Sequence, residues 1–245
     1  MKILVINSNT SDLMTQQIDT AAKRYAQPGT EIMTMTAASG PCSIEGEYDV
    51  VLSAVGTLQR LIAHEKEYDG FVVACGCDPG LYACRELTSK PVVGIGEGSM
   101  MMACLLGHRF TSMTALWRMV PRMEKIVRKY GLWERCASVR AAGATVIDIA
   151  RDRDRLVEAF IKEARIAIEQ DGADVIALSG AAMVGMDKKM EEVLGVPVTD
   201  GVVSAVKLVE AQIGYKLHTS KKKTFAFPEK KEALHIDDLL LSVYQ

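Results

Sequence analysis

Short apolar runs alternate along this chain with longer segments in which apolar residues recur every three or four positions. Consecutive apolar residues are typical of strands covered on both faces. Such runs lie at residues 2–7, 71–75, 92–95, 144–149 and 174–178. The three-and-four spacing predicts helices at residues 12–26, 50–66, 120–130, 152–170 and 202–213. Strands that alternate with helices predict βαβ units and an α/β protein with parallel sheets.

One spacing recurs between the two halves of the chain. In "YDGFVVACGC" Asp69 precedes Cys75 by 6 residues, and in "GADVIALSGA" Asp174 precedes Gly180 by 6. A proline follows 16 residues after Cys75 and 17 after Gly180, in "SKPVVGIGEG" and "LGVPVTDGVV". Self-similarity of this kind indicates repeated architecture. The sequence therefore predicts two similar α/β halves in which Gly180 corresponds to Cys75.

Polar strand ends agree with this repeat. Asn9 precedes Cys75 by 66 residues, and Thr114 precedes Gly180 by 66. Ligands of open α/β sheets bind beyond the carboxyl ends of the strands. We therefore expect the following loops to border one cleft between two domains: residues 8–11, 75–79, 112–116 and 179–184. The predicted domains are residues 1–100 plus 207–245, with Cys75, and residues 101–206, with Gly180.

Composition narrows the classes of partner. The 245 residues are 49% hydrophobic, enough for one large core or two smaller ones, and the net charge is −2. No basic patch suggests nucleic acid, and no apolar run reaches the length of a membrane span. The first residues, "MKILVINSNT", read as a strand and a turn. We expect a cytoplasmic protein whose partners are small molecules or copies of itself, and whose six cysteines stay reduced.

Cys75 is the candidate for reactive chemistry. Asp78 and Pro79 suit the cap and first position of a helix that "LYACREL" continues, so Cys75 is expected just before a helix N-terminus. Such a position favours the thiolate and would hold an enolate oxygen. A small buried residue at a strand end is the alternative that composition leaves open. A zinc site is not expected, because no histidine lies near Cys75, Cys77 and Cys84. Redox pairs usually have two intervening residues, and Cys75 and Cys77 have one.

Several segments resemble the Asp/Glu/hydantoin racemase superfamily and, within it, the hydantoin and allantoin racemase branch. "ILVINSNTS" is similar to that branch's opening Asn-Pro-Asn-Thr loop, with Ser8 in place of proline. "YDGFVVACGCDPGLYACREL" is similar to its first catalytic segment, "PVVGIGEGSMMMACLLGHRF" and "WRMVPRMEKIVRKYGL" to its central stretch, and "HTSKKKTFAFPEKK" to its closing segment. The resemblance implies two pseudosymmetric α/β domains with a cleft between them, no cofactor, no metal and a homo-oligomer.

The resemblance also assigns site residues. Members of the branch use two cysteines on opposite faces of a carbon next to a carbonyl, one removing the proton and the other returning it. Cys75 matches the first; the second motif, Leu-Gly-Cys-Ala-Gly-Met, matches residues 178–183, where Gly180 replaces the cysteine. The expected substrate-binding positions are the polar residues Asn9, Thr10 and Thr114 and the backbone N–H groups of Gly76, Ser179 and Ala181.

Three functions follow from this pattern. The first is a racemase-like isomerase of hydantoin-type rings in which Cys75 is one base and water or another group is the other. The second is a one-cysteine lyase or hydrolase, which decarboxylates a related substrate or attacks a hydantoin-like ring through sulfur. The third is a binding protein that keeps the fold without the chemistry.

Overall fold

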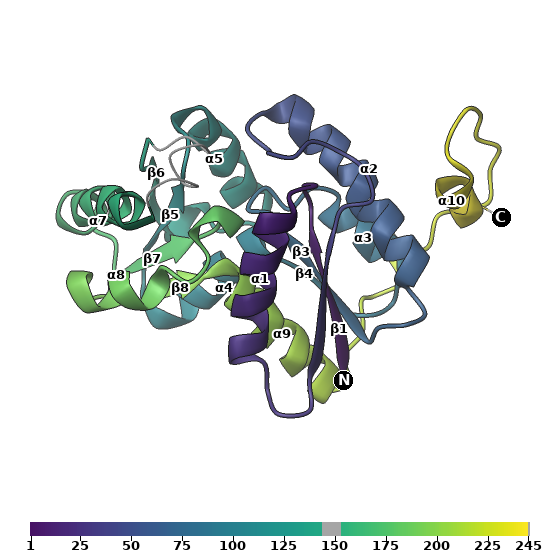
Figure 1. Cartoon of the computed structure of the whole chain (residues 1–245), viewed down its shortest axis with the longest axis horizontal. Helices are drawn as coiled ribbons and strands as arrows, with labels where there is room; N and C mark the ends of the chain where they lie inside the picture. The colour runs from purple at the N-terminus through teal and green to yellow at the C-terminus, as the bar shows by residue number, and fades with distance from the viewer. Residues whose placement is uncertain (144–152, 245) are drawn as a thin grey trace. The chain divides into compact units, whose positions relative to one another are not determined.

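Two four-stranded sheets organise the protein in a computed structural model that describes residues 1–143 and 153–244 (Figure 1). The strands of the first sheet lie in the order β2-β1-β3-β4, with bounds Glu31–Thr36, Lys2–Asn7, Gly70–Ala74 and Val92–Gly94. The strands of the second lie in the order β6-β5-β7-β8, with bounds Cys136–Ala141, Phe110–Thr114, Val175–Leu178 and Val198–Asp200. The predicted α/β class is confirmed. The strand expected at residues 144–149 lies outside the described residues.

Helices connect the strands. Those associated with the first sheet are α1 (Asp12–Tyr25), α2 (Glu47–His64), α3 (Leu81–Leu87), α9 (Gly201–Gly214) and the terminal α10 (Asp238–Leu241). Those associated with the second are α4 (Ile95–Leu106), α5 (Val120–Lys129), α7 (Arg153–Glu169) and α8 (Asp187–Leu194). The predicted helices at residues 12–26 and 120–130 are confirmed to within one residue at each end, because both have an uninterrupted apolar face.

Parallel pairing explains the continuous apolar runs. β1 pairs in parallel with β2, and residues 3–6 of β1 are fully buried. In the second sheet β5 pairs in parallel with β6 and with β7, and β7 pairs with β8. Helices α7 and α8 pack against each other and against this sheet (Figure 1). Phe160 of α7 lies in the same core as Met113 and Ile176. Strands covered in this way carry apolar residues on consecutive positions.

The apolar pattern of the sequence did not predict four of the strands: β2, β5, β6 and β8. β2 and β6 are edge strands with several partly exposed positions, so "EIMTMT" and "CASVRA" lack a continuous apolar run. β5 is central and buried, but its sequence "FTSMT" is polar at Thr111 and Ser112. Hydrogen bonds between hydroxyl groups let these residues lie inside the sheet: Thr111 Oγ1 is 2.9 Å from Ser138 Oγ on β6.

Contacts divide the chain into two compact units. The first comprises Met1–Val73, Pro79–Val93 and Val206–Gln245, and the second Ala74–Asp78 and Gly94–Ala205. The sequence prediction has its boundaries after residues 100 and 206. The contacts group α4 with the second sheet because it packs against β7, β8 and β5. The turn that follows β3, with Cys75, also belongs to the second unit.

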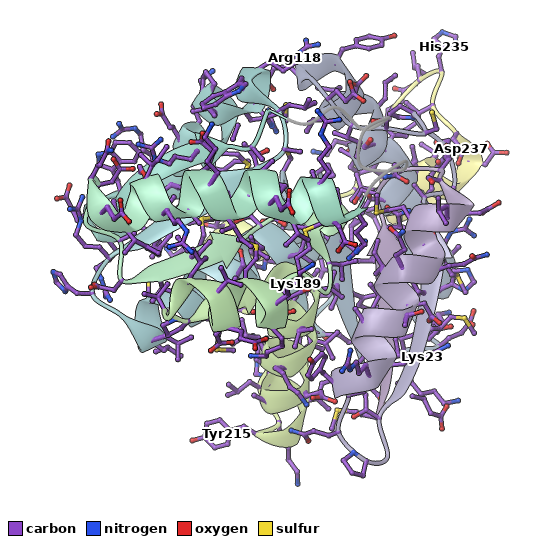
Figure 2. The ribbon with its side chains drawn as sticks, turned by 60° about the vertical axis from the view of Figure 1, so that its left-hand side comes forward. Lys23, Arg118, Lys189, Tyr215, His235 and Asp237 are labelled. Carbon is purple, nitrogen blue, oxygen red and sulfur yellow. The ribbon has the colours of Figure 1, made fainter. Side chains whose placement is uncertain are left out.

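Charged side chains pair on the outer surfaces of the helices. Lys23 on α1 lies 2.8 Å from Asp19 one turn earlier, and Lys189 on α8 lies 2.8 Å from Asp154 on α7 (Figure 2). Such exposed pairs contribute little to stability. Within residues 1–143 and 153–244, none of the helices has the length and apolar character that crossing a membrane requires.

Candidate functional site

Cys75 lies in a tight turn that follows β3. The turn is closed by a hydrogen bond from the Asp78 backbone N–H to the Cys75 carbonyl, over 2.8 Å. Asp78 has a φ of +46°, a left-handed conformation that non-glycine residues rarely adopt. Helix α3 begins only at Leu81, after Gly80 as its N-cap. The expectation that Asp78 caps this helix with Pro79 as its first residue is therefore wrong.

Asp78 instead caps a different helix. Its carboxylate accepts hydrogen bonds from the backbone N–H groups of Gly96 (3.0 Å) and Glu97 (2.7 Å), in the first turn of α4. It also accepts one from the hydroxyl of Tyr130, at the end of α5, over 2.6 Å. Burial raises the pKa of Asp78 to about 7 although these three donors lower it. The carboxylate thus fixes the Cys75 turn to two helices of the second unit.

The Cys75 turn also packs against the loop that follows β7. A Cβ atom on Gly76 would lie 2.6 Å from the carbonyl oxygen of Ser179 and 3.1 Å from the Cα of Gly180. Only glycine allows this approach of one backbone to the other. The structure therefore brings the loop of Cys75 and Gly76 next to the loop of Ser179 and Gly180, and the repeat in the sequence makes Gly180 the counterpart of Cys75.

Gly180 leaves space beside this turn. Its φ of −102° and ψ of 145° are accessible to any L-amino acid. Among the described residues other than its chain neighbours, a Cβ atom on Gly180 would meet one atom within 4 Å, the terminal methyl carbon of Met183, at 2.8 Å. Ala181 begins the short 3₁₀ helix Ala181–Met183 directly afterwards. The backbone at position 180 can accept a side chain, and the sequence provides none.

The hydroxyl of Ser179 belongs to a buried cluster of three serines. Ser179 Oγ lies 3.0 Å from Ser99 Oγ on α4 and 3.0 Å from Ser112 Oγ on β5. All three side chains are buried, and Ser99 also donates to the Gly96 carbonyl over 3.1 Å. The Ser179 side chain is therefore directed into the interior, which leaves its backbone N–H as the group expected at a substrate.

The remaining predicted binding residues lie at strand ends. Asn9 follows β1 in the first unit, and its side-chain oxygen accepts hydrogen bonds from Asn7 Nδ2 (2.8 Å) and the Ser11 backbone N–H (2.9 Å). The backbone N–H of Thr10 donates to the Pro41 carbonyl over 3.1 Å. Thr114 ends β5 in the second unit, where its carbonyl accepts from the Ala142 N–H. These contacts order the loops that carry the three residues.

The sequence did not predict the surroundings of the Cys75 thiol. The Cys75 and Cys77 thiols affect each other's pKa, and the guanidinium of Arg122 on α5 affects the pKa of Cys77. Cys77, followed by burial, raises the pKa of Cys75 well above its ordinary value. Cys75, together with Arg122, lowers the pKa of Cys77 despite burial. The expected lowering of the Cys75 pKa by an adjacent helix N-terminus is therefore wrong.

Arg122 and Tyr130 are thus site residues that sequence reasoning missed, and Cys77 was considered only as a metal ligand or redox partner. Arg122 lies on α5 and Tyr130 directly follows it. The amphipathic pattern of this helix predicts how it packs, but it does not predict a role for either residue in the site. The Cys-Gly-Cys spacing was the one available signal for Cys77. Within residues 1–143 and 153–244, histidine, cysteine, aspartate and glutamate do not gather in any group of three or more that could hold a metal ion.

Known proteins of the same family resemble this chain over most of its length. A hydantoin racemase from Pseudomonas sp. (strain NS671) is 43% identical over 233 residues, 95% of this chain and 94% of that protein. A hydantoin racemase from Rhizobium meliloti is 37% identical over 234 residues, 95% of this chain and 97% of that protein. The structure of an allantoin racemase from Klebsiella pneumoniae superposes with a TM-score of 0.93 at 38% identity, covering 98% of each chain.

These relatives support a racemase-type isomerase as the class of enzyme. The model of the Asp/Glu/hydantoin racemase family matches residues 3–209, which include the Cys75 turn, the serine cluster and Gly180. The chain therefore belongs to the Asp/Glu/hydantoin racemase family.

Proposed function

We propose that this protein is a cofactor-independent, racemase-type isomerase that acts on a hydantoin-type ring at the carbon next to a carbonyl, with Cys75 as its acid and base. The observation that carries this proposal is the position of Cys75. Cys75 is a partly exposed residue on a turn that packs against the loop of Gly180. The relatives named hydantoin racemase and allantoin racemase support the choice of ring.

The chemistry requires a base, a site for the negative charge and an acid. The Cys75 thiolate takes the proton from the ring carbon, and the electron pair of the broken C–H bond moves onto the carbonyl oxygen as an enolate. Backbone N–H groups of Gly76, Ser179 and Ala181 are the proposed donors to that oxygen. Asn9, Thr10 and Thr114 are the proposed polar contacts of the ring.

The opposite face of the ring carbon has no thiol. Gly180 cannot donate a proton, so we propose that a water molecule beside Gly180 protonates that face. Water is a weaker acid than a thiol, because its pKa is far higher. We therefore expect the enzyme to exchange the hydrogen at the ring carbon faster than it inverts the configuration.

A one-cysteine lyase or hydrolase is the second candidate, and the space at Gly180 favours it. Among the described residues other than its chain neighbours, only the flexible end of Met183 lies within 4 Å of a Cβ at that position, and its displacement would make room for a carboxyl group or an attacking water. In a decarboxylase, loss of carbon dioxide would create the enolate and Cys75 would protonate it. In a hydrolase, the Cys75 sulfur would attack a ring carbonyl, the ring C–N bond would break with proton transfer to the nitrogen, and water would then cleave the acyl–sulfur bond and return the free thiol.

The experiment that tests the proposal follows both enantiomers of a 5-substituted hydantoin by chiral chromatography. Wild type should convert either enantiomer into a racemic mixture with the total amount unchanged, and Cys75→Ala should not. Cys42→Ala is the matched control, because Cys42 is an exposed thiol remote in sequence from the Cys75 turn. Loss of total substrate would support the lyase or hydrolase instead, and equal activity of Cys75→Ala and wild type would overturn both.

We also propose that the protein works as a homo-oligomer in the cytoplasm. Analytical ultracentrifugation measures the first property, and a single sedimenting species with the mass of one chain would contradict it. Fractionation of the producing cells measures the second.

A further inference from the structure

The peptide group between Cys75 and Gly76 has a fixed direction. Its carbonyl accepts a hydrogen bond from the Asp78 backbone N–H over 2.8 Å, so the carbonyl points into the turn. In a planar trans peptide the C=O and the N–H point in opposite directions. The Gly76 N–H therefore points out of the turn, and it is one of the groups that the proposed function assigns to the enolate oxygen.

Gly76 also packs against two other segments of the second unit. A Cβ atom on Gly96, in the first turn of α4, would overlap the carbonyl oxygen of Gly76. A Cβ atom on Gly76 itself would lie 2.6 Å from the Ser179 carbonyl oxygen. Glycine at both positions allows these backbones to come so close. The peptide groups on both sides of Gly76 are therefore held by their surroundings.

The side chain of Asp78 fastens the turn to α4 and to the end of α5. Its Oδ1 accepts from the Gly96 N–H over 3.0 Å, and its Oδ2 accepts from the Glu97 N–H over 2.7 Å. Oδ2 also accepts from the Tyr130 hydroxyl over 2.6 Å. The carboxylate is buried, so water competes little for these hydrogen bonds. Asp78 thus holds the Cys75 carbonyl with its backbone and the second unit with its side chain.

The backbone conformation of Asp78 points to a role beyond folding. Its φ of +46° lies in the left-handed region, which residues other than glycine rarely adopt. Such backbone strain persists only where the surrounding structure holds it, and it gathers at functional sites. Here the three hydrogen bonds to the carboxylate hold it, directly beside the partly exposed Cys75.

We propose that Asp78 and Tyr130 are positioning residues of the isomerase, which hold the Cys75–Gly76 peptide so that its N–H meets the enolate oxygen formed in the reaction. This inference deepens the proposed function and rests on it. Neither residue touches the substrate in this arrangement. Both act through the Gly76 N–H and through the place of Cys75 on the same turn.

A fixed N–H group matters more for the enolate than for the substrate. The ring carbonyl is neutral before the proton is removed, and its oxygen becomes negatively charged afterwards. A donor that is already oriented stabilises this charge without having to move. A misdirected donor therefore weakens the enolate more than the bound substrate, which lowers kcat and leaves KM nearly unchanged.

The test measures the affinity for urazole (1,2,4-triazolidine-3,5-dione) by isothermal titration calorimetry near pH 8. In urazole a nitrogen atom replaces the reacting ring carbon of a hydantoin, and its planar anion carries negative charge on the carbonyl oxygens as the enolate does. Asp78→Asn and Tyr130→Phe should each bind urazole about 10-fold or more weakly than wild type, because a small displacement of a donor has a large effect. Both variants should bind uncharged hydantoin with nearly the wild-type affinity.

Two matched controls remove the same groups elsewhere. Asp237→Asn changes a carboxylate that caps α10, and Tyr215→Phe removes the hydroxyl of an exposed tyrosine (Figure 2). A third control, Phe160→Leu, lies in the core of the second unit and should lower stability without changing the urazole affinity. A purely structural role of Asp78 or Tyr130 would give the result of Phe160→Leu.

Kinetics supply a second measurement. In Asp78→Asn and Tyr130→Phe, kcat for a 5-substituted hydantoin should fall about 10-fold with little change in KM. The double variant should fall no further than Asp78→Asn, because the hydroxyl acts only through the carboxylate. Circular dichroism confirms that each variant is folded. If Asp78→Asn does not fold, Tyr130→Phe provides the test, because it removes a single hydrogen bond.

The outcomes separate this inference from the proposed function. Equal urazole affinity of wild type, Asp78→Asn and Tyr130→Phe would overturn the positioning role, even in a protein that racemises hydantoins through Cys75. Weaker binding by both variants of a protein that leaves hydantoins unchanged would support the positioning role and contradict the proposed reaction. A wild type that binds no urazole would overturn both.

Discussion

Gly76 lies against the backbone of Ser179 so closely that a Cβ atom on it would be 2.6 Å from the Ser179 carbonyl oxygen. This approach joins the turn of Cys75 to the loop of Gly180. Both loops follow the carboxyl end of a strand, β3 in one case and β7 in the other. The two positions that the repeat relates in the sequence are therefore neighbours in the structure.

Gly76→Ala should separate these loops. The methyl group would meet three backbone atoms at 2.6–3.1 Å, which cannot yield as a flexible side chain can. We expect the free energy of unfolding to fall by about 1–3 kcal/mol, measured by urea denaturation. Gly214→Ala lies at the exposed end of α9, where the new methyl would meet no atom of the described residues within 4 Å apart from its chain neighbours and its own helix backbone, and this control should lower it by less than about 0.5 kcal/mol. Equal stabilities of the two variants would contradict the close approach.

Gly180→Cys should supply the missing acid on the second face. The backbone conformation accepts the side chain, and the end of Met183 can move away from it. A positioned acid contributes about 10²-fold or more to proton transfer, so the rate of inversion should rise by about that factor relative to Gly180→Ser. Chiral chromatography measures this rate. If the cysteine and serine variants invert the substrate equally fast, position 180 does not face the reacting carbon.

Asp78 should make stability depend on pH. Its pKa is about 7 in the folded protein and about 3.8 for an ordinary aspartate, so the folded state binds the proton more tightly. The stabilisation from this group is present at low pH and is lost as the pH rises from about 4 to about 7. We expect the unfolding free energy of wild type, relative to Asp78→Asn, to fall by about 3–4 kcal/mol between pH 4 and pH 8.

Urea denaturation of both proteins across this pH range measures the difference. The contributions of other titrating groups to the pH dependence cancel in this difference, because both proteins contain those groups. Parallel stability curves for wild type and Asp78→Asn would show that Asp78 ionises alike in the folded and unfolded states.

Ser179→Ala should destabilise the second unit. The change removes the hydroxyl that bonds both Ser99 and Ser112 inside the protein, and it leaves Ser112 without that partner. The expected loss in unfolding free energy is about 1–3 kcal/mol. Ser89→Ala, at an exposed position, is the matched control with an expected change below about 0.5 kcal/mol. A loss no larger than that of the control would mean that the three hydroxyls do not form a cluster in solution.

The repeat and the apolar runs in the sequence predicted the two similar α/β halves and several of their buried strands. β1 and β7 are buried on consecutive positions, and parallel strands require this wherever helices cover both faces. The strand-end positions Cys75 and Gly180 follow from the equal spacing of the two halves. β3 and β7 hold the same third place in their two sheets, so the equal spacing reflects the equivalent topology of the two halves.

Contacts between residues far apart in the sequence were not predictable in this way. Asp78 looks like a cap for the helix that follows it, but its left-handed backbone directs the carboxylate to α4, 18 residues later. One signal was available in retrospect: Gly94 and Gly96 leave the space that the Asp78 carboxylate occupies, because a side chain on either would overlap it. Arg122 lacks even such a signal, since its effect on Cys77 depends on how α5 packs.

The most direct test of the central claim is the uptake of deuterium at the ring carbon of a single hydantoin enantiomer, followed by proton NMR in D₂O. Rates are corrected for exchange without protein, and Cys42→Ala is the control. Wild type and the control should exchange the hydrogen faster than they invert the configuration. The exchange rate of Cys75→Ala should be at least about 10²-fold lower than that of wild type. Exchange by Cys75→Ala at the wild-type rate would contradict the assignment of Cys75 as the group that moves the proton.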